Sequence, residues 1–174
     1  MSSANARLPK GLFIATVVVA WLYFSHYYFL LPRVVASHFD QHGFANGWQT
    51  KQSFFGIFAG MSLLAAFLVF GLPATISVMP TRLINLPHKD YWLGPDERAA
   101  SLQFLSAWFA WFGCAVYFVI VAAYDFAVQT NLHPRAAPNV ARLWFTLAFL
   151  VAFTITWTSR LFARFGRLPR PPSP

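Results

Sequence analysis

The chain has 174 residues, of which 57% are hydrophobic, 19% aromatic and only 10% charged. This composition is too apolar for a soluble domain of this length, and the apolar residues lie in long unbroken blocks, so we expect an all-α integral membrane protein in which residues 1–174 form one domain. The formal net charge of +8 does not indicate a nucleic-acid partner, because the cations flank the apolar blocks, where they set membrane topology and attract anionic lipid.

The first apolar block covers residues 11–31 and carries no formal charge. At about 1.5 Å rise per residue it is long enough to cross the ~30 Å hydrocarbon core of a bilayer. A cleaved secretory signal peptide is the alternative, because Arg7 and Lys10 precede the block and small residues follow it at Val34 and Ala36. Signal peptides usually carry only about 7 to 15 apolar residues, so we interpret the block as a retained transmembrane helix.

The connection that follows, residues 31–51, is the one most dense in chemically specific side chains. Its proline cannot continue the first helix, and its glycines and Asn-Gly pair accept positive φ, so we predict a folded loop that turns back as a hairpin. We expect its tryptophan at the membrane interface and its final lysine at the lipid headgroups. The residues concerned are Pro32, Gly43, Asn46, Gly47, Trp48 and Lys51.

The same connection contains a candidate metal site. If residues 37–42 are extended, His38, Asp40 and His42 project from one face, because side chains alternate along a strand. Imidazole and carboxylate groups are zinc ligands, and three of them would leave an open position for water. The alternative, which we favour, is an interfacial loop without metal or other cofactor, in which His38 and Asp40 form hydrogen bonds within the turn.

The second block covers residues 53–73 and can continue to Met79, with a kink expected at Pro73. The connection after it, residues 84–102, is a polar and aromatic patch that we interpret as an elbow on the membrane surface. Gly94 and Pro95 interrupt this connection before the third helix. The members of the patch are Asn85, His88, Lys89, Asp90, Tyr91 and Trp92.

The third and fourth blocks cover residues 101–126 and 143–162, and the expected disordered tail covers residues 166–174. Four transmembrane helices therefore account for most of the chain. Transport of ions usually leaves titratable residues at mid-membrane depth, whereas those in these four blocks lie near the block ends. They are His26, Asp125 and Arg160. The sequence gives a transporter or pump little support.

Small residues recur at four-residue spacing in two of the blocks. They are Gly56 and Gly60 in the second block, and Ser106, Ala110 and Cys114 in the third. Small side chains let helix backbones approach closely in lipid, so we expect the second and third helices to pack tightly, with homodimerisation as the alternative. Cys114 is the one cysteine, so the chain has no intrachain disulfide.

The basic residues near the block ends predict the orientation of the helices. With both termini in the cytoplasm, the cytoplasmic side holds nine of the 13 Lys and Arg residues, and the other side holds Arg33, Lys51, Arg135 and Arg142. We therefore predict connection 31–51 outside and connection 84–102 inside. Side chains on opposite sides of the bilayer cannot share an active site, which argues against a hydrolase site composed of both connections.

Two segments resemble a known family. The first matches at Leu31, Pro32, His38, Phe39, Asp40, Gly43, Asn46, Gly47, Trp48 and Lys51. The second, NLPHKDYWLGPDERAASL, matches at Asn85, Leu86, Pro87, Lys89, Asp90, Tyr91, Trp92 and Pro95. In order and spacing these residues resemble the bacterial membrane family described as domain of unknown function 1648, which also occurs in the immunity protein against a sporulation-delaying toxin. The resemblance implies a bacterial inner-membrane protein, and it puts His42 at a variable position, which weakens the three-ligand site.

Three functions are consistent with these residues. The first is a non-enzymatic membrane protein whose outer connection recognises either a membrane-active peptide or a partner protein. Recognition of a peptide would give it a role in immunity or sensing. The second is an accessory or assembly subunit of a larger membrane complex, indicated by the small size of the chain and its small-residue seams. The third is a metal-dependent membrane enzyme.

Overall fold

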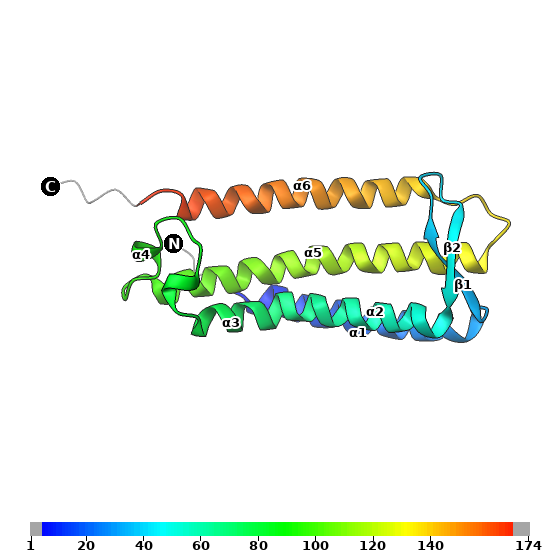
Figure 1. The fold of residues 1–174 in the computed structure, drawn as a ribbon, viewed down its shortest axis with the longest axis horizontal. Coiled ribbons are helices and arrows are strands. Elements are labelled where there is room, and N and C mark those ends of the chain that lie inside the picture. Colours follow the sequence, from blue (N-terminus) through cyan, green and yellow to red (C-terminus); the bar gives the residue numbers. More distant parts are fainter. Residues whose placement is uncertain (1–4, 169–174) are drawn as a thin grey trace.

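Four long helices run side by side and make up most of the structure, a computed structural model that describes residues 5–168 (Figure 1). They are α1 (Arg7–Leu30), α2 (Lys51–Ala66) with its continuation, α5 (Arg98–Leu132) and α6 (Val140–Phe165). The fold is 73% helical, and each of the four is long and apolar enough to span a membrane, as predicted. Most of the expected disordered tail, residues 169–174, lies outside the described residues.

The second long helix is continuous from Lys51 to Val78 but not uniformly α-helical. A π-helical turn, η1 (Phe67–Gly71), separates α2 from α3 (Leu72–Val78), in which Pro73 occupies the first turn. Proline has no backbone N–H and its ring conflicts with the carbonyl four residues earlier, and the wider π turn accommodates both defects. The predicted continuation of this helix is confirmed, and the irregularity lies in the turn before Pro73.

The helix α5 extends well beyond the predicted end at residue 126. Its last turns are polar, and two of their side chains bond back to the helix: Thr130 Oγ1 donates to the Phe126 carbonyl and Asn131 Nδ2 to the Ala127 carbonyl, both at 2.8 Å. These bonds satisfy the polar side chains within the helix, which continues past the apolar block to the hairpin described next. The fold therefore has one end where α5 meets a β-hairpin, here called the hairpin end.

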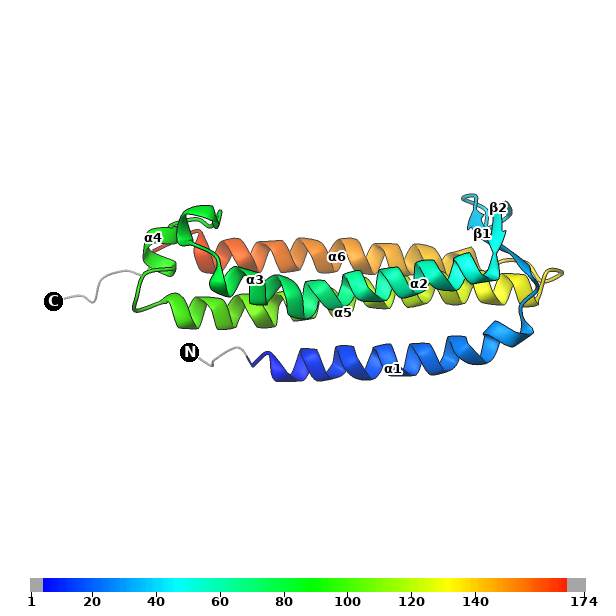
Figure 2. The same ribbon diagram turned by 60° about the horizontal axis from the view of Figure 1, so that its bottom comes forward.

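The predicted hairpin is present and lies across this end of the bundle (Figures 1 and 2). Its strands, β1 (Val34–Phe39) and β2 (Ala45–Thr50), are antiparallel, with Val34 opposite Thr50 and an irregular register after Ala36. Gly43 takes a positive φ of 83° in the turn, as predicted. The prediction that Asn46 and Gly47 form the turn is wrong, because both lie within β2.

The opposite end, here called the α4 end, holds the start of α1, the end of α6 and the connection between α3 and α5 (Figure 1). That connection contains the short 3-10 helix η2 (Thr81–Leu83) and the single-turn helix α4 (Lys89–Trp92). His88 precedes α4 with a left-handed φ of 51°. The indole of Trp92 is buried against the ring of Phe165, with centroids 5.5 Å apart.

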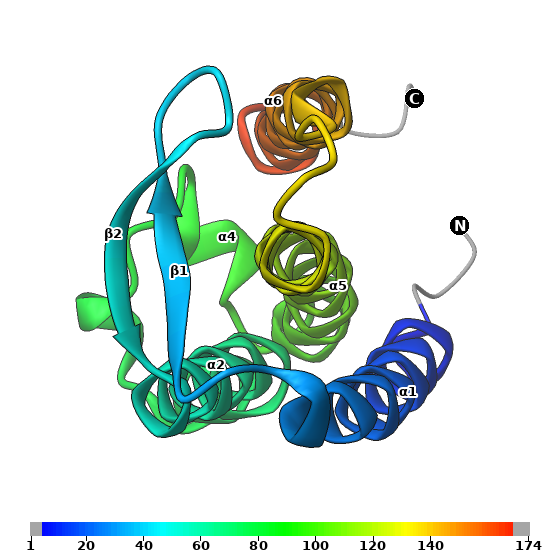
Figure 3. The same ribbon diagram turned by 90° about the vertical axis from the view of Figure 1, so that its right-hand side faces the viewer.

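The centre of the bundle is α5, which contacts each of the other three long helices. In the end-on view of Figure 3, α1 and α2 flank α5 on one side and α6 lies on the other. Aromatic side chains fill the first interface: the ring of Phe58 lies 4.8 Å from the rings of both Phe24 and Tyr124. On α5, Ala110 is fully buried and the thiol of Cys114 donates to the Pro9 carbonyl at 3.3 Å.

The tight contact expected between the second and third helices is formed by a different glycine. A Cβ added at Gly113 of α5 would collide with Val69 of η1, whereas a Cβ added at Gly56 or Gly60 would meet nothing within 4 Å. The prediction that Gly56 and Gly60 pack against α5 is therefore wrong. Both lie on the exposed face of α2.

Candidate functional site

The hairpin turn is organised by a single carboxylate. Asp40 Oδ1 accepts from the backbone N–H groups of His42, at 2.8 Å, and Phe44, at 2.9 Å. The backbone adds two bonds, from Asp40 N–H to the Phe44 carbonyl and from Gly43 N–H to the Asp40 carbonyl. Because the carboxylate accepts the N–H groups that the turn leaves open, it fixes the turn, as expected for Asp40.

The three candidate metal ligands do not converge. The strand β1 ends at Phe39, so Asp40 lies in the turn, and the extended run 37–42 that would align His38, Asp40 and His42 does not form. His38 Nδ1 lies 3.1 Å from Ser37 Oγ, and His42 Nε2 lies 3.1 Å from Gln41 Nε2. Among residues 5–168 no three His, Cys, Asp or Glu side chains are grouped so as to hold a metal ion. The three-ligand hypothesis is wrong.

The glycines of the hairpin are required by close contacts. A Cβ on Gly43 would lie 2.7 Å from Pro138 Cβ, in the connection between α5 and α6, and its φ also disfavours any side chain. A Cβ on Gly47 would lie 3.0 Å from His38 Cβ across the hairpin. Gly43 thus lets the turn rest on the α5–α6 connection, and Gly47 leaves room for the His38 side chain.

The end of α5 holds the inner edge of the hairpin. Asn131 acts as a third strand would: its Oδ1 accepts from Ala36 N–H and its Nδ2 donates to the Ala36 carbonyl, both at 2.8 Å. The ring of Phe39 packs edge-on against Phe126 of the same helix, with centroids 5.1 Å apart. Sequence reasoning missed Asn131, because its two bonds join residues 95 positions apart.

Lys51 joins the hairpin to the end of α1. Its Nζ donates to the carbonyl of Tyr28 at 3.0 Å and of Leu31 at 3.2 Å, and it lies 4.8 Å from the centroid of the Tyr28 ring. A cation at the C-terminus of a helix donates hydrogen bonds to carbonyls that lack a partner within the helix, and it interacts favourably with the helix dipole. The ammonium of Lys51 therefore caps α1, and its expected position at the lipid headgroups stays a prediction. Leu31, next to Pro32, is buried beneath it.

The outer edge of the hairpin is open. The sheet has two strands, and β1 lies between β2 and α5, so β2 forms the free edge (Figure 3). The N–H and C=O of Ala36 bond to Asn131 and not to the opposite strand. Ala36 and its cross-strand partner Trp48 are therefore a non-hydrogen-bonded pair, and the backbone N–H and C=O of Trp48 point to the open side of β2. The side chains of Phe44 and Trp48 are 64% and 61% exposed. A strand edge with free hydrogen-bonding groups and exposed aromatic rings is suited to pairing with an extended peptide.

A buried carboxylate lies beneath the hairpin end. Asp125 of α5 is 6% exposed and forms an ion pair with Arg142 of α6, which is half exposed. Tyr23 of α1 donates its hydroxyl to Asp125 Oδ1 at 2.6 Å, and Gln129 Nε2 donates to the Tyr23 hydroxyl at 3.1 Å. Side chains of three helices, α1, α5 and α6, surround Asp125. The sequence signal for this ion pair was a single acidic residue in the third apolar block and an arginine directly before the fourth.

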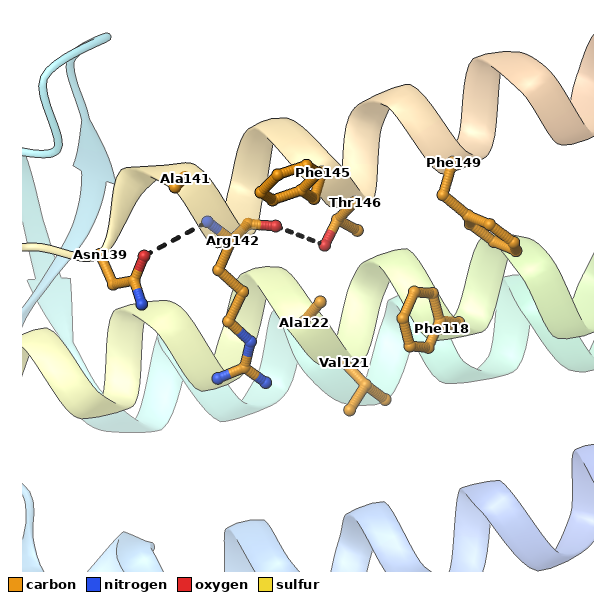
Figure 4. A pocket seen from close by; sticks show the side chains of 9 residues that line it. All are labelled: Phe118, Val121, Ala122, Asn139, Ala141, Arg142, Phe145, Thr146 and Phe149. Carbon is orange, nitrogen blue, oxygen red and sulfur yellow. Dashed lines mark hydrogen bonds between the residues drawn. The ribbon is translucent and has the colours of Figure 1, made fainter.

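A cavity of about 830 Å³ opens beside this ion pair, between α5 and α6. Its walls are apolar, chiefly Phe118, Val121 and Phe149, and Arg142 reaches across it from α6 towards α5 (Figure 4). Thr146 Oγ1 donates to the Arg142 carbonyl at 2.8 Å. An apolar cavity with one cation at its end accommodates an amphipathic group.

The residues of the second motif lie at the α4 end, far from the hairpin (Figure 1). Leu86 and Trp92 are buried there, while Lys89, Asp90 and Tyr91 form α4. Asn85, Pro87 and Pro95 lie in the turns on either side. The two motifs therefore form two separate surfaces, in agreement with the prediction that they share no active site.

Comparisons with protein-family models, with curated proteins and with solved structures found no match for this chain. The resemblance to domain of unknown function 1648 stays a prediction.

Proposed function

We propose that this chain is a non-enzymatic, multi-pass membrane protein that recognises an extended peptide segment by adding it to the free edge of β2. The observation that carries the proposal is the open β2 edge, with Phe44 and Trp48 exposed beside it. Main-chain hydrogen bonds along such an edge provide affinity, and side-chain contacts on either side provide selectivity. Aromatic rings add large contact area at low cost in conformational entropy.

The hairpin is prepared for binding before any peptide arrives. Asn131 holds β1, Lys51 ties the end of β2 to α1, and Asp40 closes the turn. A rigid edge loses little conformational entropy when a peptide pairs with it, so more of the interaction energy appears as affinity. This rigidity supports recognition as the role of the hairpin, rather than simple connection of two helices.

The ligand we propose is a membrane-active peptide, and the role is immunity to it or sensing of it. The proposed setting is the bacterial inner membrane, with both termini in the cytoplasm and the hairpin outside. The distribution of basic residues supports this orientation, and the resemblance of the two motifs supports the membrane and the ligand class. A peptide that inserts into the outer surface would meet the hairpin at the level of the headgroups.

Photocrosslinking in intact cells tests the proposal. A crosslinking side chain replaces Asn46, which is exposed on β2, and the matched control replaces Leu83, which is exposed at the α4 end. Cells are then treated with a panel of membrane-active peptides. We expect a crosslinked peptide from position 46 and none from position 83. Equal labelling at both positions, or no labelling across the panel, contradicts the proposal.

Two substitutions separate edge pairing from aromatic contact. Trp48→Ala keeps the backbone N–H of β2, whereas Trp48→Pro removes both the ring and the outward N–H while leaving the bonds to β1 in place. We expect peptide crosslinking from position 46 to fall with Trp48→Ala and to fall further with Trp48→Pro. Identical effects of the two variants would exclude strand addition and leave aromatic contact alone.

A second function, that of a subunit in a larger membrane complex, is favoured by the exposure of α6. Only 6% of the apolar window of α6 is buried, against 39% for α5. Gly56 and Gly60 also leave the α2 face open to close approach by another helix. Native mass measurement after gentle detergent extraction tests this function. A stoichiometric heteromeric complex supports it, and a lone monomer or homodimer contradicts it.

A further inference from the structure

The α4 end contains a second cavity, of about 680 Å³, with a different chemistry from the first. Three arginines line it, Arg160 and Arg164 of α6 and Arg167 just after its end, and they face aromatic side chains of α4 and α5 that include Trp92, Phe104 and Trp108. Arg160 and Arg164 are four residues apart and so lie on one face of α6. The cavity therefore combines three guanidinium groups with an apolar, aromatic wall.

Arg164 lies inside an aromatic box. Its guanidinium carbon is 4.7 Å from the centroid of the Phe104 ring and 5.5 Å from the centroids of both Trp92 and Phe165. The rings stabilise the cation and fix the plane of the guanidinium. The box supplies no hydrogen-bond acceptor, however, and the Nε of Arg164 is buried without a partner.

A second buried donor at this cavity also lacks a partner. Trp92 is 7% exposed, and its indole Nε1 is buried and forms no hydrogen bond. A buried donor without an acceptor costs about 1–3 kcal/mol, so such groups in a folded protein call for an explanation. Both atoms are covered by neighbouring protein atoms, so a group in the cavity would reach them only after the side chains around them shift.

No carboxylate neutralises these arginines. Within residues 5–168 the one ion pair joins Arg142 and Asp125, at the hairpin end, and the three guanidinium groups of the cavity form no hydrogen bond to the described protein. Three adjacent cations repel one another and create a positive potential. A phosphate oxyanion fits this environment, because arginine binds its oxygens through two parallel N–H bonds.

We propose that this cavity binds the phosphate group of an anionic phospholipid, with the phosphate on the three arginines and an acyl chain along the aromatic wall. Free phosphate offers the same oxyanion but leaves the apolar wall uncovered. The cavity lies where α5 begins and α6 ends. Its wall continues along these two helices, both of which are long and apolar enough to span a membrane. Both parts of a phospholipid therefore find matching surface. The proposal goes beyond peptide recognition and does not depend on it.

Native mass spectrometry of the full chain in a neutral detergent tests this proposal. The added ligands are dioctanoyl phosphatidylglycerol, dioctanoyl phosphatidylcholine and inorganic phosphate, in separate titrations. The variants are Arg164→Gln and the double variant Arg160→Gln/Arg167→Gln, which leaves the aromatic box intact and so guards against misfolding. The matched control for Arg164→Gln is Arg82→Gln, which also removes one positive charge, at an exposed position of the same end.

We expect phosphatidylglycerol to bind with a Kd about tenfold lower than that of phosphatidylcholine, and both cavity variants to raise that Kd about tenfold, since a charge-assisted bidentate contact is lost. The Kd of the Arg82→Gln variant should change less than about twofold. Equal affinity for the two lipids, or equal effects of the cavity and control variants, overturns the proposal. Binding of inorganic phosphate with the same Kd as phosphatidylglycerol would also overturn it, because free phosphate would then be the ligand.

Discussion

Trp108 of α5 and Trp157 of α6 bind each other reciprocally: each indole N–H donates to the backbone carbonyl of the other residue, at 3.2 and 3.0 Å, and the rings stack 3.3 Å apart. Carbonyls in a helix interior are normally used within the helix, so these two accept a second bond. The pair fixes both the distance and the register between α5 and α6. This pair therefore joins α6 to α5, the helix that it mainly contacts.

The first prediction concerns this tryptophan pair. Trp157→Phe removes the indole N–H that donates to the Trp108 carbonyl and reduces the stacked area, so we expect the free energy of unfolding to fall by about 1–3 kcal/mol. Trp144→Phe is the matched control, because Trp144 lies on the same helix and is exposed. Unfolding in mixed micelles, followed by circular dichroism, measures both variants. Equal losses in the two variants would contradict a role for the pair.

The second prediction concerns the buried carboxylate. Asp125→Asn leaves the Arg142 guanidinium and the Tyr23 hydroxyl without their anionic acceptor. We expect the free energy of unfolding to fall by about 1–3 kcal/mol, less than for a fully buried pair, because water reaches the half-exposed Arg142. Asp96→Asn, at an exposed position, is the control. A double-mutant cycle with Arg142→Gln isolates the pair. If the effects of Asp125→Asn and Arg142→Gln simply add, the ion pair contributes nothing to stability.

The four long apolar helices were predictable from the sequence, because an apolar block of sufficient length needs no partner to be recognised. The helix ends were not, since α5 continues to Leu132 through polar residues such as Thr130 and Asn131, beyond its apolar block. The packing seam was also misjudged: Gly56 and Gly60 carry the familiar spacing, yet the contact is made by Gly113, whose partner Val69 no local pattern reveals.

The candidate site divides in the same way. The turn role of Asp40 and the positive φ of Gly43 follow from local chemistry, and both were predicted. Asn131, the partner of Ala36, and Arg142, the partner of Asp125, come from other helices, so their roles appear only once the chain is folded. The general lesson is that short-range hydrogen bonding can be inferred from one sequence, whereas pairings between helices cannot.

The third prediction compares two glycines. Gly43→Ala places a methyl group 2.7 Å from Pro138 and at a positive φ, so we expect a loss of about 2 kcal/mol or more and faster amide exchange across residues 34–50. Gly56→Ala meets open space, and alanine is the better helix former, so this control should be neutral or slightly stabilising. A loss at Gly56 comparable to that at Gly43 would instead indicate a helix partner on the exposed α2 face.

The last prediction concerns the anchor of the hairpin. Asn131→Ala removes both bonds to the Ala36 backbone and leaves the inner edge of β1 open, so the Ala36 amide should lose protection against hydrogen exchange. Thr130→Ala is the neighbouring control, because Thr130 bonds only to its own helix. Since a loosened hairpin must be ordered when a peptide pairs with β2, crosslinking from position 46 should weaken in Asn131→Ala and stay unchanged in Thr130→Ala. Loss of Ala36 protection without weaker crosslinking would show that the rigidity of the edge is not what recognition depends on.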